Sequence, residues 1–191
     1  MLFNDKFKYC PACGSERFVE NNVKSKCCMS CGFVFYHNPS AAVAAFIFNE
    51  NEDLLVCSRA KDPAKGSWDL PGGFVDNDES AEQAIIRELE EELGVEVTDA
   101  EYLFSLPNDY LYSDLNIPTL DMFFRVRLPV CHSLIASDDV SECFFVPIAK
   151  LNPENFGLTS IRKAIYRLIN YEDTLQSGSP PSEIKNLKRL F

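Results

Sequence analysis

The sequence predicts an α/β (α+β) domain, a mixed β-sheet with helices on both faces, preceded by a small N-terminal zinc ribbon. Three observations predict it: two Cys-x-x-Cys pairs, short apolar runs typical of strands, and two amphipathic helical segments. The chain has 191 residues, 46% of them hydrophobic, which suffices for one core and a small appendage. We expect the ribbon at 1–36, the main domain at 37–172, and a linker and short tail at 173–191.

The cysteine pairs lie at 10–13 and 28–31, with fourteen residues between them. Two close pairs suit one tetrahedral zinc, and the glycine after each pair lets the backbone turn back toward the thiolates. Two disulfides are the alternative, which the lack of a recognisable secretory signal disfavours. Cys27 could replace Cys28 as a ligand, but only Cys28 keeps the two-residue spacer. The predicted ligands of a structural Zn2+ are Cys10, Cys13, Cys28 and Cys31.

Strands are predicted where short apolar runs lie between polar turns. Residues 41–49 and 54–59 are two such runs, joined by the polar segment 50–53, and they suit a β-hairpin. The other predicted elements are strands at 95–106, 120–128 and 143–146 and an amphipathic helix at 158–171. This order suits a mixed sheet with helices on both sides.

A further helix is predicted at 79–93, because apolar residues recur there every four positions, at Ala81, Ile85, Leu89 and Leu93. Gly94 follows at the position of a helix-ending glycine. One side of this helix is therefore expected to pack inward while its acidic residues face the other way.

The acidic side of that helix gathers Glu88, Glu91 and Glu92, although like charges three and four positions apart repel. A solvated acidic face is the ordinary explanation of such a helix. Here, however, the turn 71–73 reads Pro-Gly-Gly and can expose backbone carbonyls beside the carboxylates. Together these oxygens favour a site for a hard divalent cation.

The segment 73–95 resembles the signature of the Nudix hydrolases. Gly73 is followed after five residues by Glu79, and after seven more by the run 87–95, RELEEELGV, so that every specified position is filled. The approach at 66–74, GSWDLPGGF, is similar to that of the family as well. The resemblance implies an α/β/α sandwich and hydrolysis of a nucleoside diphosphate linked to another group, with Mg2+ or Mn2+ required.

The resemblance also implies roles for individual residues. The predicted catalytic residues are Glu88, Glu91, Glu92, Glu142 and Arg87. Arg87 would be an orienting partner that pairs with Glu79 or a helix carboxylate, with a phosphate ligand as the alternative. A later glutamate often completes the metal site or acts as the base, and Glu142 fits by position, with Asp138 and Asp139 as rivals and a solvated loop acid as the alternative. The implied metal ligands are Glu88, Glu91, Glu92, Glu142 and a backbone carbonyl of Gly72 or Gly73. The general base stays open among Glu88, Glu91 and Glu142.

A zinc ribbon that leads into such a domain is similar to one branch of the family, the NADH pyrophosphatases. That branch carries a Ser-Gln-Pro-Trp-Pro-Phe-Pro-x-Ser array, which the segment 105–113, SLPNDYLYS, matches in part. The tryptophan and two prolines are missing. NAD(H) and ADP-ribose, each releasing AMP, are therefore both expected substrates, and other ADP-linked compounds stay open.

Base recognition requires flat apolar faces, which aromatic side chains supply. In the branch that the chain resembles, two aromatic rings sandwich the base, which implies Phe74 and Tyr36 here. Core packing is the alternative for Tyr36. Tyr110 is a weaker candidate, and Arg59 could contact phosphate or carry a simple strand-end charge.

The formal charge of −11 argues against a nucleic acid as the main partner, because phosphate contacts require Lys and Arg. The apolar stretches are too short for a signal peptide or a membrane span, so we expect a cytoplasmic protein. The resemblance also implies a homodimer. The competing class is a non-catalytic module that senses nucleotides, but such a regulator is expected to lose metal ligands, and this segment lacks none.

Overall fold

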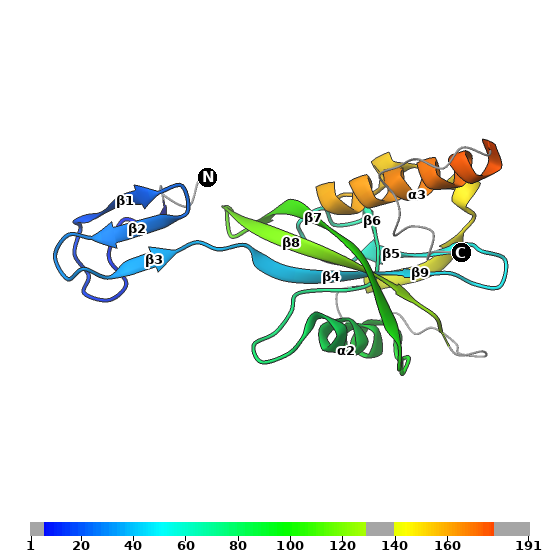
Figure 1. Ribbon diagram of the computed structural model, residues 1–191, viewed down its shortest axis with the longest axis horizontal. Helices are drawn as coiled ribbons and strands as arrows, with labels where there is room; N and C mark the ends of the chain where they lie inside the picture. Colours follow the sequence, from blue (N-terminus) through cyan, green and yellow to red (C-terminus); the bar gives the residue numbers. More distant parts are fainter. Residues whose placement is uncertain (1–5, 129–139, 178–191) are drawn as a thin grey trace. The chain divides into compact units, whose positions relative to one another are not determined.

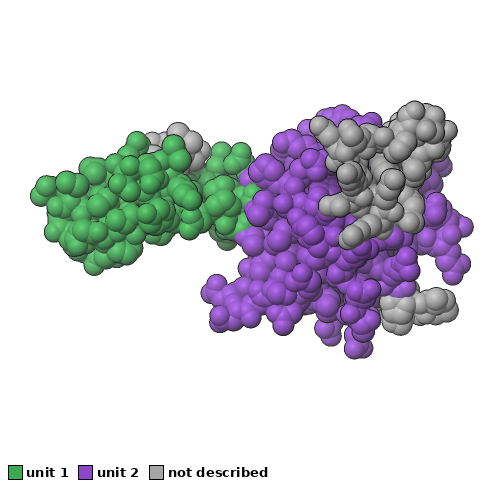
Figure 2. All heavy atoms as spheres, viewed as in Figure 1, with its two compact units in different colours: residues 1–40, 109–119 green, residues 41–108, 120–191 purple. Residues whose placement is uncertain are grey.

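The computed structural model describes residues 6–128 and 140–177 (Figure 1). The chain divides into two compact units, Met1–Ser40 with Asp109–Thr119 and Ala41–Asn108 with Leu120–Phe191 (Figure 2). The candidate residues Asp138 and Asp139, and most of the predicted tail, lie outside the described residues. In the part of the chain that is described, no helix has the length and apolar character needed to cross a membrane.

The first unit contains a three-stranded antiparallel sheet of β1 (Phe18–Asn22), β2 (Ser25–Cys28) and β3 (Val34–Tyr36). Its small core consists of Cys10, Phe18 and Cys28, with Phe7 and Phe35 packed against them. The rings of Phe7 and Phe35 stack with their centroids 5.4 Å apart. So small a core needs an additional source of stability, such as a metal.

In the described part of the main domain, six strands form two three-stranded sheets, ordered β4-β8-β7 and β6-β5-β9. The strands are β4 (Ser40–Ile47), β5 (Leu54–Arg59), β6 (Trp68–Asp69), β7 (Ala100–Tyr112), β8 (Leu115–Val126) and β9 (Val140–Val146). The helices are α2 (Ala81–Leu93) and α3 (Thr159–Ser177), with short 3-10 helices η1 (Ile148–Lys150) and η2 (Pro153–Asn155).

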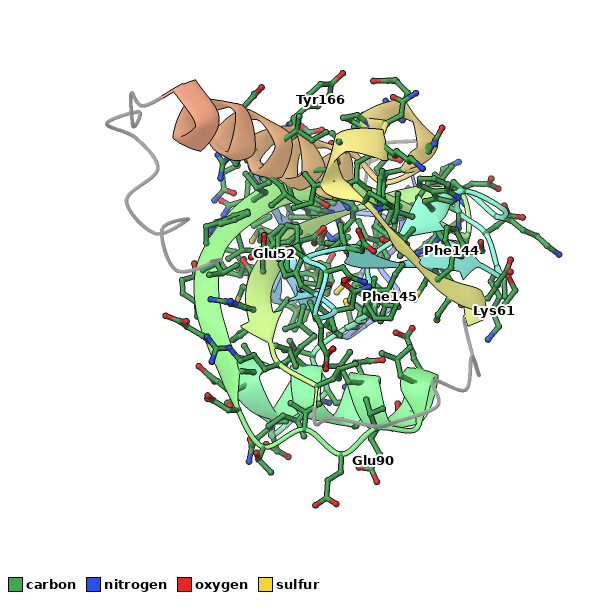
Figure 3. The ribbon with its side chains drawn as sticks, turned by 90° about the vertical axis from the view of Figure 1, so that its right-hand side faces the viewer. Glu52, Lys61, Glu90, Phe144, Phe145 and Tyr166 are labelled. Atoms are coloured by element: carbon green, nitrogen blue, oxygen red, sulfur yellow. The ribbon has the colours of Figure 1, made fainter. Side chains whose placement is uncertain are left out.

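Helices α2 and α3 cover opposite faces of these strands (Figure 1). Side chains alternate along each strand, so that Phe46 of β4 joins the core beneath α3 while Ile47 joins the core beneath α2. Phe144 and Phe145 of β9 divide between the two cores in the same way (Figure 3). The predicted α/β class with helices on both faces is confirmed. Burial on both faces also explains why 41–48 is continuously apolar.

The predicted hairpin of 41–49 and 54–59 is wrong beyond its turn. Asn49 holds that turn, because its side-chain oxygen accepts hydrogen bonds from the N–H groups of Asn51 and Asp53, each at 2.9 Å. The two strands then separate, β4 pairing with β8 and β5 with β6 and β9. The local sequence therefore specifies the turn but not the partner of either strand.

Helix α2 begins two residues later than predicted, because Ser80 caps it. The Ser80 side chain accepts from the N–H of Gln83, and the Gln83 side chain accepts from the N–H of Ser80, which forms a capping box. The predicted end is confirmed. Gly94 has a φ of 66° and donates its N–H to the carbonyl of Glu90.

Strand β7 extends past the predicted limit of 106 to Tyr112 and is joined to β8 by Ser113 and Asp114. Both turn residues have positive φ, 50° and 57°, as in the two-residue turns of hairpins. Residues 105–112, which form most of the segment that partly matches the array of the NADH pyrophosphatase branch, are therefore continuous strand.

Candidate metal centres

Helix α2 places its glutamates in different environments. Glu92 is 4% exposed, and the side chain of Glu88, one turn earlier, is 13% exposed. The side chain of Glu91 is 49% exposed, and Glu90 points away from the sheet (Figure 3). Glu88 and Glu92 therefore lie at the inner edge of the helix, where it meets the Pro-Gly-Gly turn.

The Pro-Gly-Gly turn lies directly against these two carboxylates. The N–H of Gly72 donates to Oε2 of Glu92 at 2.9 Å. A Cβ atom on Gly73 would lie 2.4 Å from Oε1 of Glu88, so a side chain at this position would displace the Glu88 carboxylate. The turn is anchored on β4, because the N–H of Val43 donates to the Gly73 carbonyl at 2.8 Å.

One guanidinium, that of Arg87, connects the surrounding acids. It donates to Glu79 at 2.6 and 3.1 Å, to Glu88 at 2.9 Å and to Glu91 at 3.1 Å. It also donates to the carbonyl of Phe74 at 3.0 Å, which ties the helix to the residue after the glycine pair. The hydrogen bonds from Arg87 lower the pKa of the Glu79 carboxyl. Arg87 therefore orients three carboxylates at once.

Ionisation of Glu92 is costly in the folded protein. Its pKa is raised to about 9, chiefly by burial and also by the nearby charges of Glu88 and Asp69, against the opposing hydrogen bond from Gly72. Burial also raises the pKa of Glu88, with Arg87 opposing. A divalent cation would replace the lost hydration of both carboxylates and offset their mutual repulsion. The residues present therefore fit a hard metal ion.

The close contact at Gly73 leads to a test of this site. We expect Gly73→Ala to displace the Glu88 carboxylate and to weaken Mg2+ or Mn2+ binding about 10- to 100-fold, while the fold is retained. Titration of the metal by calorimetry measures the effect. Gly72→Ala provides the contrast, because its Cβ would lie 2.2 Å from the Val43 carbonyl and should lower thermal stability. Unchanged metal affinity in Gly73→Ala would contradict the assignment.

Glu142 lies at the start of β9, exposed and in register with Ser58 of β5. By strand alternation it shares a face with Phe144, whereas Cys143 joins the core beneath α2. The structure thus groups Gly72, Gly73, Arg87 and the helix glutamates, while Glu142 is an exposed residue of β9. Its role as ligand or base stays a prediction.

The predicted substrate-binding residues differ in their surroundings. The guanidinium of Arg59 donates to the carboxylate of Asp69 and to the Pro63 carbonyl at 2.7 Å, so it serves a structural ion pair. Phe74, beside the glycine turn, is 39% exposed, and Tyr36, in the other unit, is 50% exposed. Tyr110 is half-buried in the β7–β8 hairpin. The role of these rings in base binding stays a prediction.

Three further residues near Glu92 were not predicted to lie there. Asp69 of β6 and Cys143 of β9 flank Cys57 of β5 in register, and all three interact electrostatically with Glu92. Asp69 is buried, which raises the pKa of its carboxyl, while Arg59 opposes the shift. No local sequence pattern predicts that Asp69, Cys57 and Cys143 lie side by side, because their positions depend on which strands pair.

The ribbon cysteines form the second candidate centre. The four sulfur atoms of Cys10, Cys13, Cys28 and Cys31 all lie within 4.8 Å of one another, and Cys27 is not among them. The distances are 3.8 Å between Cys10 and Cys31 and 3.6 Å between Cys13 and Cys28. A tetrahedral zinc with Zn–S bonds of about 2.3 Å requires sulfur atoms about 3.8 Å apart. This arrangement therefore fits zinc.

Both cysteine turns have the geometry that the sequence predicts. Gly14 and Gly32 have φ values of 72° and 77°. Each glycine donates its N–H back to the first cysteine of its pair, Gly14 to the Cys10 carbonyl at 2.8 Å and Gly32 to the Cys28 carbonyl at 2.9 Å. The two glycines thus bring each pair of thiols to one side of its loop.

Comparison with known proteins identifies relatives that act on nucleotides. CTP pyrophosphohydrolase of Escherichia coli is 46% identical over 63 residues, which are 33% of this chain and 47% of that protein. The NAD-capped RNA hydrolase NudC of Pseudomonas aeruginosa is 33% identical over 98 residues, 51% of this chain and 34% of that protein. The ADP-ribose pyrophosphatase of Methanocaldococcus jannaschii is 43% identical over 60 residues, 31% and 35% of the two chains. The matches thus span between about a third and a half of each relative.

A similar solved structure and a family model each match more of the chain than these relatives do. A crystal structure of a NUDIX hydrolase from Nitrosomonas europaea superimposes with a TM-score of 0.65 and 26% identity, covering 91% of this chain and 94% of that one. The model of the NUDIX domain matches residues 38–169, which include α2 and the glycine turn. The chain therefore belongs to the Nudix family.

Proposed function

We propose that this protein is a pyrophosphohydrolase that requires Mg2+ or Mn2+ and cleaves the diphosphate of NAD(H) or ADP-ribose to release AMP. The buried carboxylate of Glu92 carries the proposal, because its charge is disfavoured without a cation. The complete set of helix carboxylates and the glycine turn beside it support the same assignment.

The residues divide into those that would hold the metal and those that hold the ligands in place. Glu88, Glu91 and Glu92 would bind the ion, and Gly72 or Gly73 would contribute a carbonyl. Bound there, the ion would neutralise diphosphate charge and lower the pKa of the attacking water. Arg87 fixes two of these carboxylates before the substrate arrives, so little reorganisation is needed on binding.

The substrate assignment has separate support. The ribbon spacing and part of the segment 105–113 resemble the NADH pyrophosphatase branch, and two relatives are named for hydrolysis of NAD-capped RNA and ADP-ribose. Phe74 adds an exposed ring beside the metal site, suited to stacking on a base. The CTP pyrophosphohydrolase relative makes CTP the necessary comparator.

The alternative is a domain that binds nucleotides without cleaving them. A sensor of that kind has no need to keep Glu92 buried beside Glu88, where ionisation is costly, as its raised pKa indicates. This cost favours the enzyme.

The test is an assay of AMP release from NADH, NAD+ and ADP-ribose, with CTP, dinucleoside polyphosphates and sugar nucleotides as comparators. We expect AMP from NADH or ADP-ribose in Mg2+ or Mn2+, and loss of activity in excess chelator. Full activity in chelator would reject the metal site. Tight binding of ADP-ribose without turnover would favour the sensor.

A further inference from the structure

The core beneath α2 contains two cysteines that face each other across neighbouring strands. Cys57 of β5 and Cys143 of β9 are direct partners in an antiparallel register. Their sulfur atoms lie 2.9 Å apart, closer than the 3.6 and 3.8 Å found between the ribbon thiols that suit a shared metal. Both are free thiols. Packing as small hydrophobic residues explains their burial, but not the direct contact of the two sulfur atoms.

The backbone geometry permits a covalent bond between them. Directly opposed residues in antiparallel strands have Cα atoms about 4.5–5.5 Å apart. Disulfides span Cα separations of about 4.4–6.8 Å. A bond between Cys57 and Cys143 therefore needs no movement of the backbone, only a short approach of the two sulfur atoms.

A metal ion is the other ligand that two adjacent thiols could bind. Over the described ranges, 6–128 and 140–177, neither Cys57 nor Cys143 belongs to a group of three or more ligand atoms close enough to hold one. Cys57 and Cys143 lack a third and fourth ligand of this kind, so the pair is better suited to oxidation than to metal binding.

The two thiols differ in access. Cys57 is 1% exposed, whereas Cys143 is only partly buried and lies one residue from exposed Glu142. An oxidant would reach Cys143 first, and Cys57 would be the resolving partner held behind it. We propose that Cys57 and Cys143 are a modification site, a dithiol that a peroxide converts to a reversible cross-strand disulfide.

The chemistry balances with a peroxide as the oxidant. Hydrogen peroxide transfers one oxygen to the Cys143 thiol, giving a sulfenic acid and one water. The Cys57 sulfur then attacks the Cys143 sulfur, the S–S bond forms, and the hydroxyl leaves with the Cys57 proton as a second water. Two electrons pass from the two thiols to the peroxide, and a dithiol reductant reverses the bond.

The bond would close a long loop between β5 and β9. It would restrict the unfolded chain between residues 57 and 143 and fix the strand that carries Glu142. We therefore expect the oxidised protein to melt several degrees above the reduced protein. The shift should disappear after treatment with dithiothreitol.

The experiment uses the full chain with its zinc bound. The protein is treated with hydrogen peroxide, the remaining thiols are alkylated, and the digest is analysed by mass spectrometry with and without reductant. The expected result is a peptide pair joining Cys57 to Cys143, together with the rise in melting temperature. Zinc release measured in parallel shows whether the ribbon thiols react instead.

Variants separate this bond from general oxidation. Cys143→Ser and Cys57→Ala should each abolish the linked peptide and the shift in melting temperature, and melting of the reduced variants shows that they fold. Cys27→Ser is the matched control and should keep both, because Cys27 lies outside the pair and outside the zinc cluster. Alkylation of both thiols after peroxide treatment, or a disulfide from Cys143 to any cysteine other than Cys57, would overturn the proposal.

Discussion

Glu92→Gln should lower the rate of AMP release in Mg2+ by about 10²-fold or more, since a metal ligand contributes several kcal/mol to stabilising the transition state. The variant should nevertheless fold. Glutamine keeps the shape of the side chain and an oxygen that can accept the hydrogen bond from Gly72. The measurement is kcat at saturating substrate, with circular dichroism to confirm the fold.

The same substitution should stabilise the metal-free protein at alkaline pH. The unfolded chain loses the Glu92 proton near pH 4.5, whereas the folded protein keeps it until about pH 9. Between these values the folded state binds more protons, so its stability falls as the pH rises. We expect the free energy of unfolding of Glu92→Gln to exceed that of the native protein by on the order of a few kcal/mol at pH 9, or roughly 5–10 °C in Tm. The two proteins should be equally stable near pH 4.

Glu90→Gln is the matched control for both measurements. Glu90 lies on the same helix but is exposed and directed away from the sheet (Figure 3). Its substitution should leave both the rate and the pH dependence of stability unchanged. Added Mg2+ should reduce the difference in stability between the native protein and Glu92→Gln, because the ion would stabilise the charged carboxylate. Equal pH dependence in all three proteins would contradict the account of Glu92.

Cys28→Ser should abolish zinc binding and unfold the ribbon. The described core of the ribbon has three buried hydrophobic residues, Cys10, Phe18 and Cys28, and two of them belong to the group of four thiols that could hold a metal. Structural zinc contributes about 10–16 kcal/mol of binding free energy at neutral pH, which far exceeds what such a core supplies. Elemental analysis should find one zinc per native chain and none per variant chain, and NMR should show loss of dispersed signals from 10–36.

Cys27→Ser is the control for this prediction. Its sulfur lies outside the group of four, 3.9 Å from the carbonyl of Cys28. Zinc content and ribbon signals should be unchanged. If Cys27→Ser released the zinc and Cys28→Ser kept it, the ligand assignment would be reversed. Native protein purified without zinc would reject the ribbon altogether.

Several features could be predicted because they depend on neighbours in the sequence. Apolar residues that recur every four positions located α2, and Gly94 ends the helix by adopting a left-handed conformation. The cysteine spacing identified the four thiols. Each short loop already holds two thiols close together, so a single contact between the two loops brings all four together. The segment 73–95 likewise identified the carboxylates and the turn, since its parts are joined by one short loop.

Other features could not be predicted, because they depend on partners far away in the chain. The turn at Asn49 suggested a hairpin, yet the hydrogen-bonding edges of β4 and β5 are filled by strands that occur later. Ser113 and Asp114 lack the Asn-Gly signal of a two-residue hairpin turn, so the full length of β7 was missed. The ion pair of Arg59 with buried Asp69 is a further example, because the two residues meet only when β5 pairs with β6.

Spacing within short segments was enough to identify the family, the four ribbon thiols and the acidic helix face. The folded structure was needed to show that Glu92 is buried while Glu90 is exposed, that Gly73 lies against the Glu88 carboxylate, and that Cys57 contacts Cys143. The reason is physical: burial, close approach and pKa depend on which strands pair and on which face of the sheet a helix covers, and no local pattern specifies either.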